Sequence, residues 1–370
     1  MSILKVSTFC SGIGSLEVAL KNLGVEHEII LTAEIDKYAR QTYLANHSTK
    51  KMINDMTVPD YEGEEWYSDI NISGLPCQSF SLAGKRLGEL DARGLLFYDF
   101  YRYVKNQQPK YFIIENVKGL LSMDKGNVFN NWKALLGQSE NGNMFLHTHE
   151  DSLMYNLHWK VLNTKNFGLP QNRERVFLIG IRKDLPNDFV FPKEIPLELR
   201  LKDLLEEEVD EKYYLSERII DFYIKNSENN KLKGNGFRFN PTDGNVVGKA
   251  ITTMSGSIMD DNYIKESIKL KQIGSIYNSN SVGGRIYDSN NISCTLTSQG
   301  GGVGAKTGLY KMEDHRIRKL TVLECFRLQG FPDDFVKLVS NSQLYKQAGN
   351  SISVPVVENI LKILLKKYIN

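Results

Sequence analysis

The sequence predicts an α/β protein with a mostly parallel sheet covered by helices on both faces, followed by a smaller, loop-rich β domain. Through the first half of the chain, apolar runs typical of buried strands alternate with segments of helical spacing. Such alternation favours a parallel sheet with crossover helices. After about residue 190 the chain becomes rich in Asn, Gly and Ser, with only short apolar runs. That composition is typical of a separate domain built from short strands and turns.

The elements of the first half follow from apolar spacing. Strands are expected at 4–9, 28–33, 69–73, 111–114 and 176–181. Helices are expected at 16–23, 37–46 and 95–105. Gly24 stands where a C-terminal helix cap belongs, and Asp36 can cap the N-terminus of the second helix.

The second half of the chain is predicted to contain short elements. Prolines at 186, 192 and 196 precede an expected charged helix over 201–217. Short strands are expected at 249–254, 273–277, 285–287 and 293–297. Disorder is the alternative for this polar region, but aromatic and β-branched residues recur through it. We expect domains at 1–190 and 191–315, a hinge over 316–343, and a strand-like and helical segment over 344–370 that returns to the first domain.

The composition and charge of the chain bear on which classes of protein it can belong to. Lys and Arg number 46 against 44 Asp and Glu, a net charge of +2 that neither requires nor excludes nucleic acid. The 4 Cys and 6 His form no metal-ligand spacing, so we expect neither a metal site nor a disulfide framework. With no signal peptide or bilayer-length apolar stretch in the sequence, a cytoplasmic protein is expected.

A glycine-rich segment, Phe9-Cys10-Ser11-Gly12-Ile13-Gly14-Ser15, joins the first strand to the first helix. Its glycines let the turn close tightly and let a ligand approach the backbone. Glu17 occupies the place of the third glycine of the dinucleotide fingerprint, which argues against a nicotinamide cofactor. Glu34, about 20 positions on, can accept hydrogen bonds from ribose hydroxyls. Asp55, near the end of a possible third strand, can hold an adenine edge or be a turn aspartate.

The heptapeptide Gly74-Leu75-Pro76-Cys77-Gln78-Ser79-Phe80 follows an expected strand. Pro76 fixes its own φ and keeps Leu75 out of the helical region. Cys77 is therefore expected at the carboxyl end of a strand, where ligands of open α/β sheets bind. The alternative is a buried, inert cysteine.

Two further polar segments end or begin strands. Glu115-Asn116-Val117 places a carboxylate that can donate a proton if burial raises its pKa; a surface capping acid is the alternative. Gln171-Asn172-Arg173-Glu174-Arg175 places two arginines suited to a planar, electron-rich substrate, unless they form a surface ion-pair strand.

Together these segments resemble the DNA cytosine carbon-5 methyltransferases, in the family's order and over nearly the whole chain. The resemblance extends to Arg318-Lys319-Leu320-Thr321, to Gln329-Gly330-Phe331-Pro332 and to Gly349-Asn350-Ser351. It implies a Rossmann-like, S-adenosylmethionine-dependent fold with the loop-rich region as target-recognition domain. It implies that Cys77 adds to carbon 6 of cytosine, that Glu115 protonates or hydrogen-bonds ring nitrogen 3, and that Arg175, helped by Arg173, holds the carbonyl oxygen at carbon 2.

The resemblance also implies the residues of two binding sites. Those for S-adenosylmethionine are Phe9, Ser11, Gly12, Ile13, Gly14, Glu34, Ile35, Asp55, Pro76, Leu96, Asn350 and Ser351. Phe9 would lie against the adenine, Glu34 would bind the ribose, and Ile35 and Asp55 would flank the adenine. Those for double-stranded DNA, with the target base flipped out, are Gln78, Ser81, Lys85, Arg86, Arg93, Gly283, Gly284 and Arg285.

Three other interpretations of the function remain open. An RNA substrate is the first, although Cys325-Phe326-Arg327 is not the Cys-Phe-Thr tripeptide of the tRNA-methylating relatives. A silent DNA-binding homologue would lack Cys77, Glu115 or Arg175, and all three are present. A nucleotide-binding oxidoreductase fits only the glycine turn. We expect a monomeric, nucleoid-associated modification enzyme of prokaryotic or phage type, paired in function with a nearby restriction endonuclease without a stable complex.

Overall fold

The computed structural model describes residues 3–76, 96–204, 206–210, 274–275, 285–288, 309–311, 317–318 and 320–369. The chain divides into two compact units. Unit 1 comprises Met1–Leu162, Glu174–Lys193 and Val356–Asn370, and unit 2 comprises Asn163–Arg173 and Glu194–Pro355. The domain boundaries expected from the sequence, which divide the chain by function, remain predictions.

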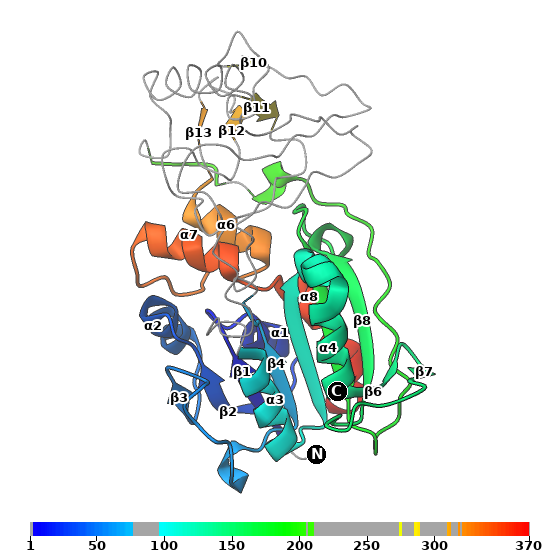
Figure 1. Cartoon of the computed structure of the whole chain (residues 1–370). Coiled ribbons are helices and arrows are strands. Elements are labelled where there is room, and N and C mark those ends of the chain that lie inside the picture. The colour runs from blue at the N-terminus through cyan, green and yellow to red at the C-terminus, as the bar shows by residue number, and fades with distance from the viewer. Residues whose placement is uncertain are drawn as a thin grey trace. The chain divides into compact units, whose positions relative to one another are not determined.

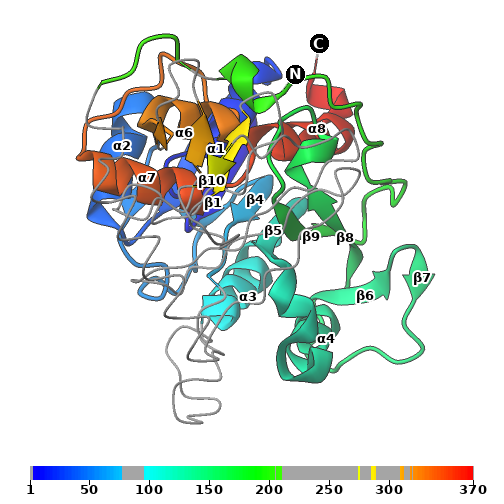
Figure 2. The ribbon, with the colours of Figure 1, turned by 90° about the horizontal axis from the view of Figure 1, so that it is seen from above.

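Unit 1 is built around a nine-stranded sheet in the order β3-β2-β1-β4-β5-β9-β8-β6-β7. Its strands are β1 (Leu4–Phe9), β2 (His27–Ala33), β3 (Met52–Ile53), β4 (Ile70–Ser73), β5 (Tyr111–Val117), β6 (Gly137–Glu140), β7 (Asn143–Met144), β8 (Tyr155–Asn163) and β9 (Glu174–Ile181). The five strands from β3 to β5 are parallel, and β9 runs antiparallel to β5. The labels β1, β4, β5, β9 and β8 follow one another across the sheet in Figure 2.

Helices lie on both faces of this sheet, as predicted (Figures 1 and 2). They are α1 (Ser15–Asn22), α2 (Lys37–Asn46), α3 (Leu96–Gln107), α4 (Asn127–Leu136) and α8 (Val354–Leu364). Helices α3 and α4 share one face, where the rings of Phe97 and Trp132 stack with centroids 4.5 Å apart. Helices α1 and α8 share the other, joined by a 3.1 Å hydrogen bond from Asn22 to Glu358. The fold class predicted from the sequence is confirmed.

Both predicted helix caps are present. The Asp36 side chain accepts hydrogen bonds from the backbone N–H groups of Tyr38 and Ala39, 2.8 and 3.2 Å away. Gly24, just past α1, has a φ of 64°, the left-handed conformation that glycine adopts at helix ends. Gly24 thus ends α1 before β2 begins, and Asp36 starts α2 shortly after β2 ends.

Unit 2 contains η5 (Leu201–Leu204), α6 (Val322–Gln329), α7 (Asn341–Asn350) and a second sheet in the order β10-β11-β12-β13. Its strands are β10 (Gly274–Ser275), β11 (Arg285–Asp288), β12 (Leu309–Lys311) and β13 (Ile317–Arg318). β10 falls within the strand predicted at 273–277, and β11 extends one residue past the strand predicted at 285–287. β12 and β13 were not predicted, and the strands predicted at 249–254 and 293–297 lie outside the described residues. Short 3₁₀ segments complete the described chain: η1 (Glu64–Trp66), η3 (Lys118–Gly126), η4 (Thr164–Asn166) and η8 (Lys366–Tyr368).

The helix predicted over 201–217 is wrong for the part of it that the structure describes. Only Leu201–Leu204 is helical, as a single 3₁₀ turn. The reason is that the backbone N–H of Glu206 donates to the Glu324 carboxylate at 2.9 Å instead of to a carbonyl of its own segment. The segment predicted at 344–370 is helical in α7 and α8 and contains no strand among its described residues.

No helix within the described ranges combines the length and the apolar character that crossing a bilayer requires.

Candidate active site

A tight glycine turn follows β1. Cys10, Gly12 and Gly14 all have left-handed backbone conformations, with φ of 50°, 58° and 91°. A Cβ atom on Gly14 would lie 2.4 Å from the imidazole ring of His47, so only glycine fits there. The His47 Nε2 atom is 3.2 Å from the Ile13 carbonyl oxygen. His47, the C-cap residue of α2, therefore packs against the turn and helps to fix its conformation.

The carboxylate of Glu34 is fixed at the carboxyl end of β2. Its Oε2 atom accepts a hydrogen bond from the Gly12 N–H at 2.8 Å, and its Oε1 atom accepts one from the Asp36 N–H at 2.8 Å. Burial raises the pKa of Glu34, and these two bonds oppose that rise. Next to it, the Ile35 side chain is 75% exposed. An apolar side chain displayed beside a buried carboxylate suits an adenosine, which combines an apolar ring face with ribose hydroxyls.

The charges of two carboxylates act on the Cys10 thiol. Its pKa is raised to about 12, first by burial and then by the charges of Glu34 and Asp55. Asp55 is half-buried, and its Oδ1 atom accepts a 2.9 Å hydrogen bond from the Thr57 N–H. Asp55 is therefore a turn aspartate that also lies near the glycine turn, so both sequence interpretations of this residue are compatible with the geometry.

The remaining residues predicted for the glycine turn are buried to different degrees. Phe9 is fully buried, with its ring 5.6 Å from that of Tyr61 and 4.8 Å from that of Tyr103. This burial does not support a direct contact between Phe9 and an adenine, because the ring faces the core beneath the turn. Ile13 is 1% exposed, whereas Ser11 is half-buried.

Two predicted catalytic residues meet on adjacent strands. Glu115 of β5 and Arg175 of β9 form an ion pair with 3.1 Å between Oε1 and Nε, and 11% and 15% of their side chains are exposed. Burial lowers the pKa of Arg175, and the Glu115 charge opposes this. The pair is held in place because β5 and β9 are antiparallel neighbours, with Val117 opposite Arg175.

The chain that leads to Cys77 lies beside this pair. Ser73, the last residue of β4, pairs with Ile114 of β5, immediately before Glu115. The Asn116 side chain then donates a 2.9 Å hydrogen bond to the Leu75 carbonyl. Pro76 is exposed, and the half-buried Leu96 begins α3. Cys77, Gln78, Ser81, Lys85, Arg86 and Arg93 lie outside the described residues.

Arg173 and Ser351 meet in unit 2. The Arg173 side chain is buried, and its Nη2 atom donates a 2.9 Å hydrogen bond to the Ser351 carbonyl. Asn350 is the exposed last residue of α7, and the Ser351 hydroxyl donates to the Gln347 carbonyl. This bond makes Arg173 a support for the Ser351 turn, and its contact with a base stays a prediction. Gly283 and Gly284 lie outside the described residues, and of Arg285 only the backbone, in β11, is described.

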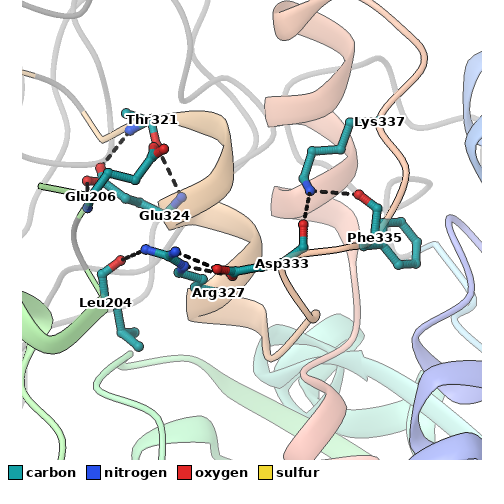
Figure 3. Close-up of polar contacts among 8 residues, drawn as sticks. All are labelled: Leu204, Glu206, Thr321, Glu324, Arg327, Asp333, Phe335 and Lys337. Carbon is teal, nitrogen blue, oxygen red and sulfur yellow. Dashed lines mark hydrogen bonds and ion pairs between the residues drawn. The ribbon is translucent and has the colours of Figure 1, made fainter. Parts of the chain in front are cut away.

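Polar contacts join the two ends of the region expected to read DNA (Figure 3). Thr321 and Glu324 form a capping box at the start of α6. The Thr321 hydroxyl donates to the Glu206 carboxylate. One turn on, Arg327 donates to the Leu204 carbonyl at 3.0 Å and forms a two-pronged ion pair with Asp333. These contacts hold Leu204 and Glu206 against α6.

A buried polar cluster that sequence motifs did not predict involves Glu17 of α1. Glu17, 3% exposed, accepts a 2.6 Å hydrogen bond from the Tyr43 hydroxyl and a longer one from Thr8. Its Oε2 atom is buried and has no hydrogen-bond partner among the described residues. Burial raises the pKa of Glu17 to about 7, and burial also lowers the pKa of His47 to about 4. The only sequence signal was an acidic residue in the first turn of an apolar helix.

Within the described ranges, no three His, Cys, Asp or Glu side chains are placed to hold a metal ion.

The parallel sheet, the glycine turn and the acidic end of β2 define the class: an α/β fold of the S-adenosylmethionine-dependent methyltransferases. Residues 4–366 match the family described as C-5 cytosine-specific DNA methylase. The chain belongs to this family and is a DNA cytosine-5 methyltransferase.

Individual relatives agree with this assignment. The chain is 34% identical to the orphan methyltransferase M.SPRI of Bacillus phage SPR, with 100% of this chain and 99% of the relative covered. It is 34% identical to the type II methyltransferase M.HpaII of Haemophilus parainfluenzae, with 96% and 88% covered. The crystal structure of Dnmt2 methyltransferase from S. pombe has a similar fold, with a TM-score of 0.67, 19% identity, and 98% and 99% of the chains covered.

Proposed function

We propose that this enzyme methylates carbon 5 of a cytosine within a specific double-stranded DNA sequence, using S-adenosylmethionine and a covalent adduct between Cys77 and carbon 6 of the base. The observation that carries the proposal is the Glu115–Arg175 pair beside the strand that leads to Cys77. An acid and a cation held together at the carboxyl end of β5 are two of the groups that this chemistry requires, and Cys77 would supply the thiol.

The chemistry explains each residue type. Carbon 5 of cytosine is a weak nucleophile, and addition of the Cys77 thiolate at carbon 6 turns the ring into an enamine that can attack a methyl group. Glu115 protonates or hydrogen-bonds ring nitrogen 3, which offsets the negative charge that develops. Arg175 donates to the carbonyl oxygen at carbon 2. Loss of the carbon 5 proton then breaks the bond between carbon 6 and sulfur and restores the ring.

The residues of unit 1 fit S-adenosylmethionine, which supplies the methyl group when bound. Glu34 would bind the ribose hydroxyls and Ile35 would pack against the adenine. Asp55 would accept a hydrogen bond from the amino group of the adenine edge. Both Glu34 oxygens already accept backbone N–H bonds, so the carboxylate is oriented before any ligand arrives. A base within a duplex cannot reach Cys77 and Glu115 together, so the target base is flipped out.

The covalent step is tested with a duplex that carries 5-fluorocytosine at the target position, because fluorine blocks the final elimination. The target is first found by bisulfite sequencing of DNA from cells that express the gene. The wild type is expected to form an adduct that survives denaturing electrophoresis, and Cys77→Ser to form none while still binding the duplex. Absence of an adduct on the methylated sequence would contradict the mechanism. Methylation of RNA instead of DNA would favour the RNA alternative.

We further propose that the enzyme serves DNA modification in a prokaryotic or phage setting, in the cytoplasm and close to the nucleoid. Relatives with both orphan and type II names match the chain, so partnership with a restriction endonuclease needs its own test. Digestion of DNA from expressing cells with endonucleases that cut the identified site is expected to fail, and cleavage would contradict a protective role.

A further inference from the structure

Arg102 on α3 binds the loop that follows β3. Its Nη2 atom donates hydrogen bonds of 3.0 Å to the carbonyls of Thr57 and Pro59. The same atom lies 2.9 Å from Oδ1 of Asp99, one helical turn earlier. All three oxygens lie around Nη2, so the two N–H groups of that atom are shared between the loop carbonyls and the Asp99 carboxylate.

Thr57 links Arg102 to Asp55. The carbonyl of Thr57 accepts from Arg102, while its N–H donates to Oδ1 of Asp55 at 2.9 Å. The N–H of Val58 also points back to the Asp55 carbonyl, at 3.5 Å. The orientation of the Asp55 carboxylate therefore depends on the placement of Thr57, and that placement depends on Arg102.

The loop after β3 contains a residue in a disfavoured conformation, so contacts from α3 help to hold it. Tyr61, fully buried, has a φ of 61°, a conformation disfavoured for a bulky residue. Gln107 holds the backbone at and just after Tyr61, with hydrogen bonds to the carbonyls of Tyr61 and Gly63 at 2.6 and 2.9 Å. Asn106 donates to the Asp60 carbonyl at 2.8 Å. Of these α3 side chains, Arg102 binds the end of the loop nearest Asp55.

The charges agree with this arrangement. The pKa of Asp99 is raised, first by burial and also by the charge of Asp55, and the charge of Arg102 opposes the rise. The Asp55 charge also acts on Cys10 in the glycine turn. Asp55 thus lies within electrostatic range of both the glycine turn and α3, with Arg102 as the cation on the α3 side.

We propose that Arg102 is a positioning residue for selection of the methyl donor: through Thr57 it holds the Asp55 carboxylate where the amino group of adenine can donate to it. The inference rests on the proposed function, in which Asp55 contacts that amino group. A purine with an oxygen in place of the amino group presents an acceptor, which a fixed carboxylate rejects because neither group can donate. A carboxylate free to turn away would reject it less.

The test measures binding of S-adenosylhomocysteine and S-inosylhomocysteine by calorimetry. These two ligands differ at position 6 of the purine, which carries an amino group in one and an oxo group in the other, and at N1, which carries a hydrogen only in the inosine compound. In Arg102→Gln, the preference for the adenine compound is expected to fall about tenfold, the effect of a misplaced hydrogen bond to a charged group. Asn106→Ala is the matched control, because it removes a bond from the same helix to the same loop outside the Thr57 link. It is expected to keep the preference.

A double-mutant cycle separates positioning from general loosening. If Arg102 acts through Asp55, the double variant Arg102→Gln/Asp55→Asn will prefer the adenine compound as much as Asp55→Asn alone does. An unchanged preference in Arg102→Gln, or losses that add in the double variant, would overturn the inference and leave the proposed function standing. Failure of the wild type to bind either compound would overturn both. Should Arg102→Gln not fold, Arg102→Met, which keeps an apolar stem of similar length but removes every donor, provides the same comparison.

Discussion

Glu115 and Arg175 face each other across β5 and β9, with 3.1 Å between the carboxylate Oε1 and the guanidinium Nε. Each is more than four-fifths buried, so each depends on the other for charge compensation. On the proposed mechanism, both groups also turn toward the same pyrimidine ring. Their mutual contact keeps them oriented before the base arrives.

Glu115→Gln is expected to lower kcat by a factor of about 100 or more, the usual contribution of a general acid. The donor dissociation constant should not change, because Glu34 and the glycine turn remain intact. Single-turnover methylation of a duplex and donor titration measure the two quantities. Glu174→Gln is the control, since Glu174 pairs with Lys118 at the surface. A Glu115→Gln enzyme that keeps most of its rate would remove Glu115 from the chemistry.

Glu34→Ala is expected to weaken donor binding by about 2–4 kcal/mol, because hydrogen bonds to a charged group are lost. The loss includes the bond that holds Gly12 in place, so the turn itself should loosen. Equilibrium titration of the donor measures the effect, and duplex binding should stay as in the wild type. Asp36→Asn, which keeps a capping side chain at α2, is the control. An unchanged donor dissociation constant would exclude Glu34 from the site.

Glu17 should make the stability of unit 1 depend on pH. Its pKa in the folded protein is about 7, above the value of about 4.3 expected in an unfolded chain. The folded state therefore binds a proton that the unfolded state lacks. The resulting stabilisation is complete below about pH 4 and is lost as the pH rises to about 7, a change of about 4 kcal/mol.

The measurement is urea unfolding between pH 5 and pH 8. All three tryptophans, Trp66, Trp132 and Trp159, lie in unit 1, so intrinsic fluorescence reports on that unit. Glu17→Gln cannot titrate, and its free energy of unfolding should fall less over this range than that of the wild type. Glu26→Gln, at an exposed position, should follow the wild type. Parallel pH profiles for the wild type and Glu17→Gln would show that Glu17 does not titrate as proposed.

The sequence predicted the elements whose signals are local. β1 begins and ends as expected because its apolar residues Leu4, Val6 and Phe9 are all buried and Cys10 leaves the strand with a positive φ. β5 extends three residues past its predicted end. Glu115 and Asn116 look like loop residues, but they pair with Phe177 and Val176 of β9. β8 was missed because its polar residues find distant partners, such as Asn187 for His158 and Glu140 for Trp159.

The residues of the candidate site likewise fall into those with a local sequence signal and those without one. Motifs identified Glu34, Glu115 and Arg175, because their chemistry is tied to short sequence patterns. Motifs could not show that Arg173 binds the Ser351 carbonyl, since 178 positions separate the two residues. Nor could they show the link from Arg102 to Asp55, because an Asp99–Arg102 spacing reads as an ordinary helical ion pair. Contacts that depend on tertiary structure carry no local signal.

Recognition of the DNA sequence is expected to lie in residues 191–315. The composition changes near Pro192, and motifs of the catalytic core return at Arg318. Replacing 191–315 by the matching region of a relative with a different target should switch the methylated sequence, as read by bisulfite sequencing. The flanking segments should keep the chemistry, so the 5-fluorocytosine adduct should now form on the new target.

The junctions of such a chimera matter because of the contacts in Figure 3. Exchange of 191–315 removes Glu206, to which the Thr321 hydroxyl donates, while Thr321 and Glu324 remain. A second chimera with junctions after 210 and before 320 keeps these contacts and the bond from Arg327 to Leu204. This second chimera should be the more stable of the two. It should switch the methylated sequence equally well, because specificity comes from contacts with base edges and not from the contacts of Leu204 and Glu206 with α6. An active chimera of either design that still methylates the original sequence would place recognition outside residues 191–315.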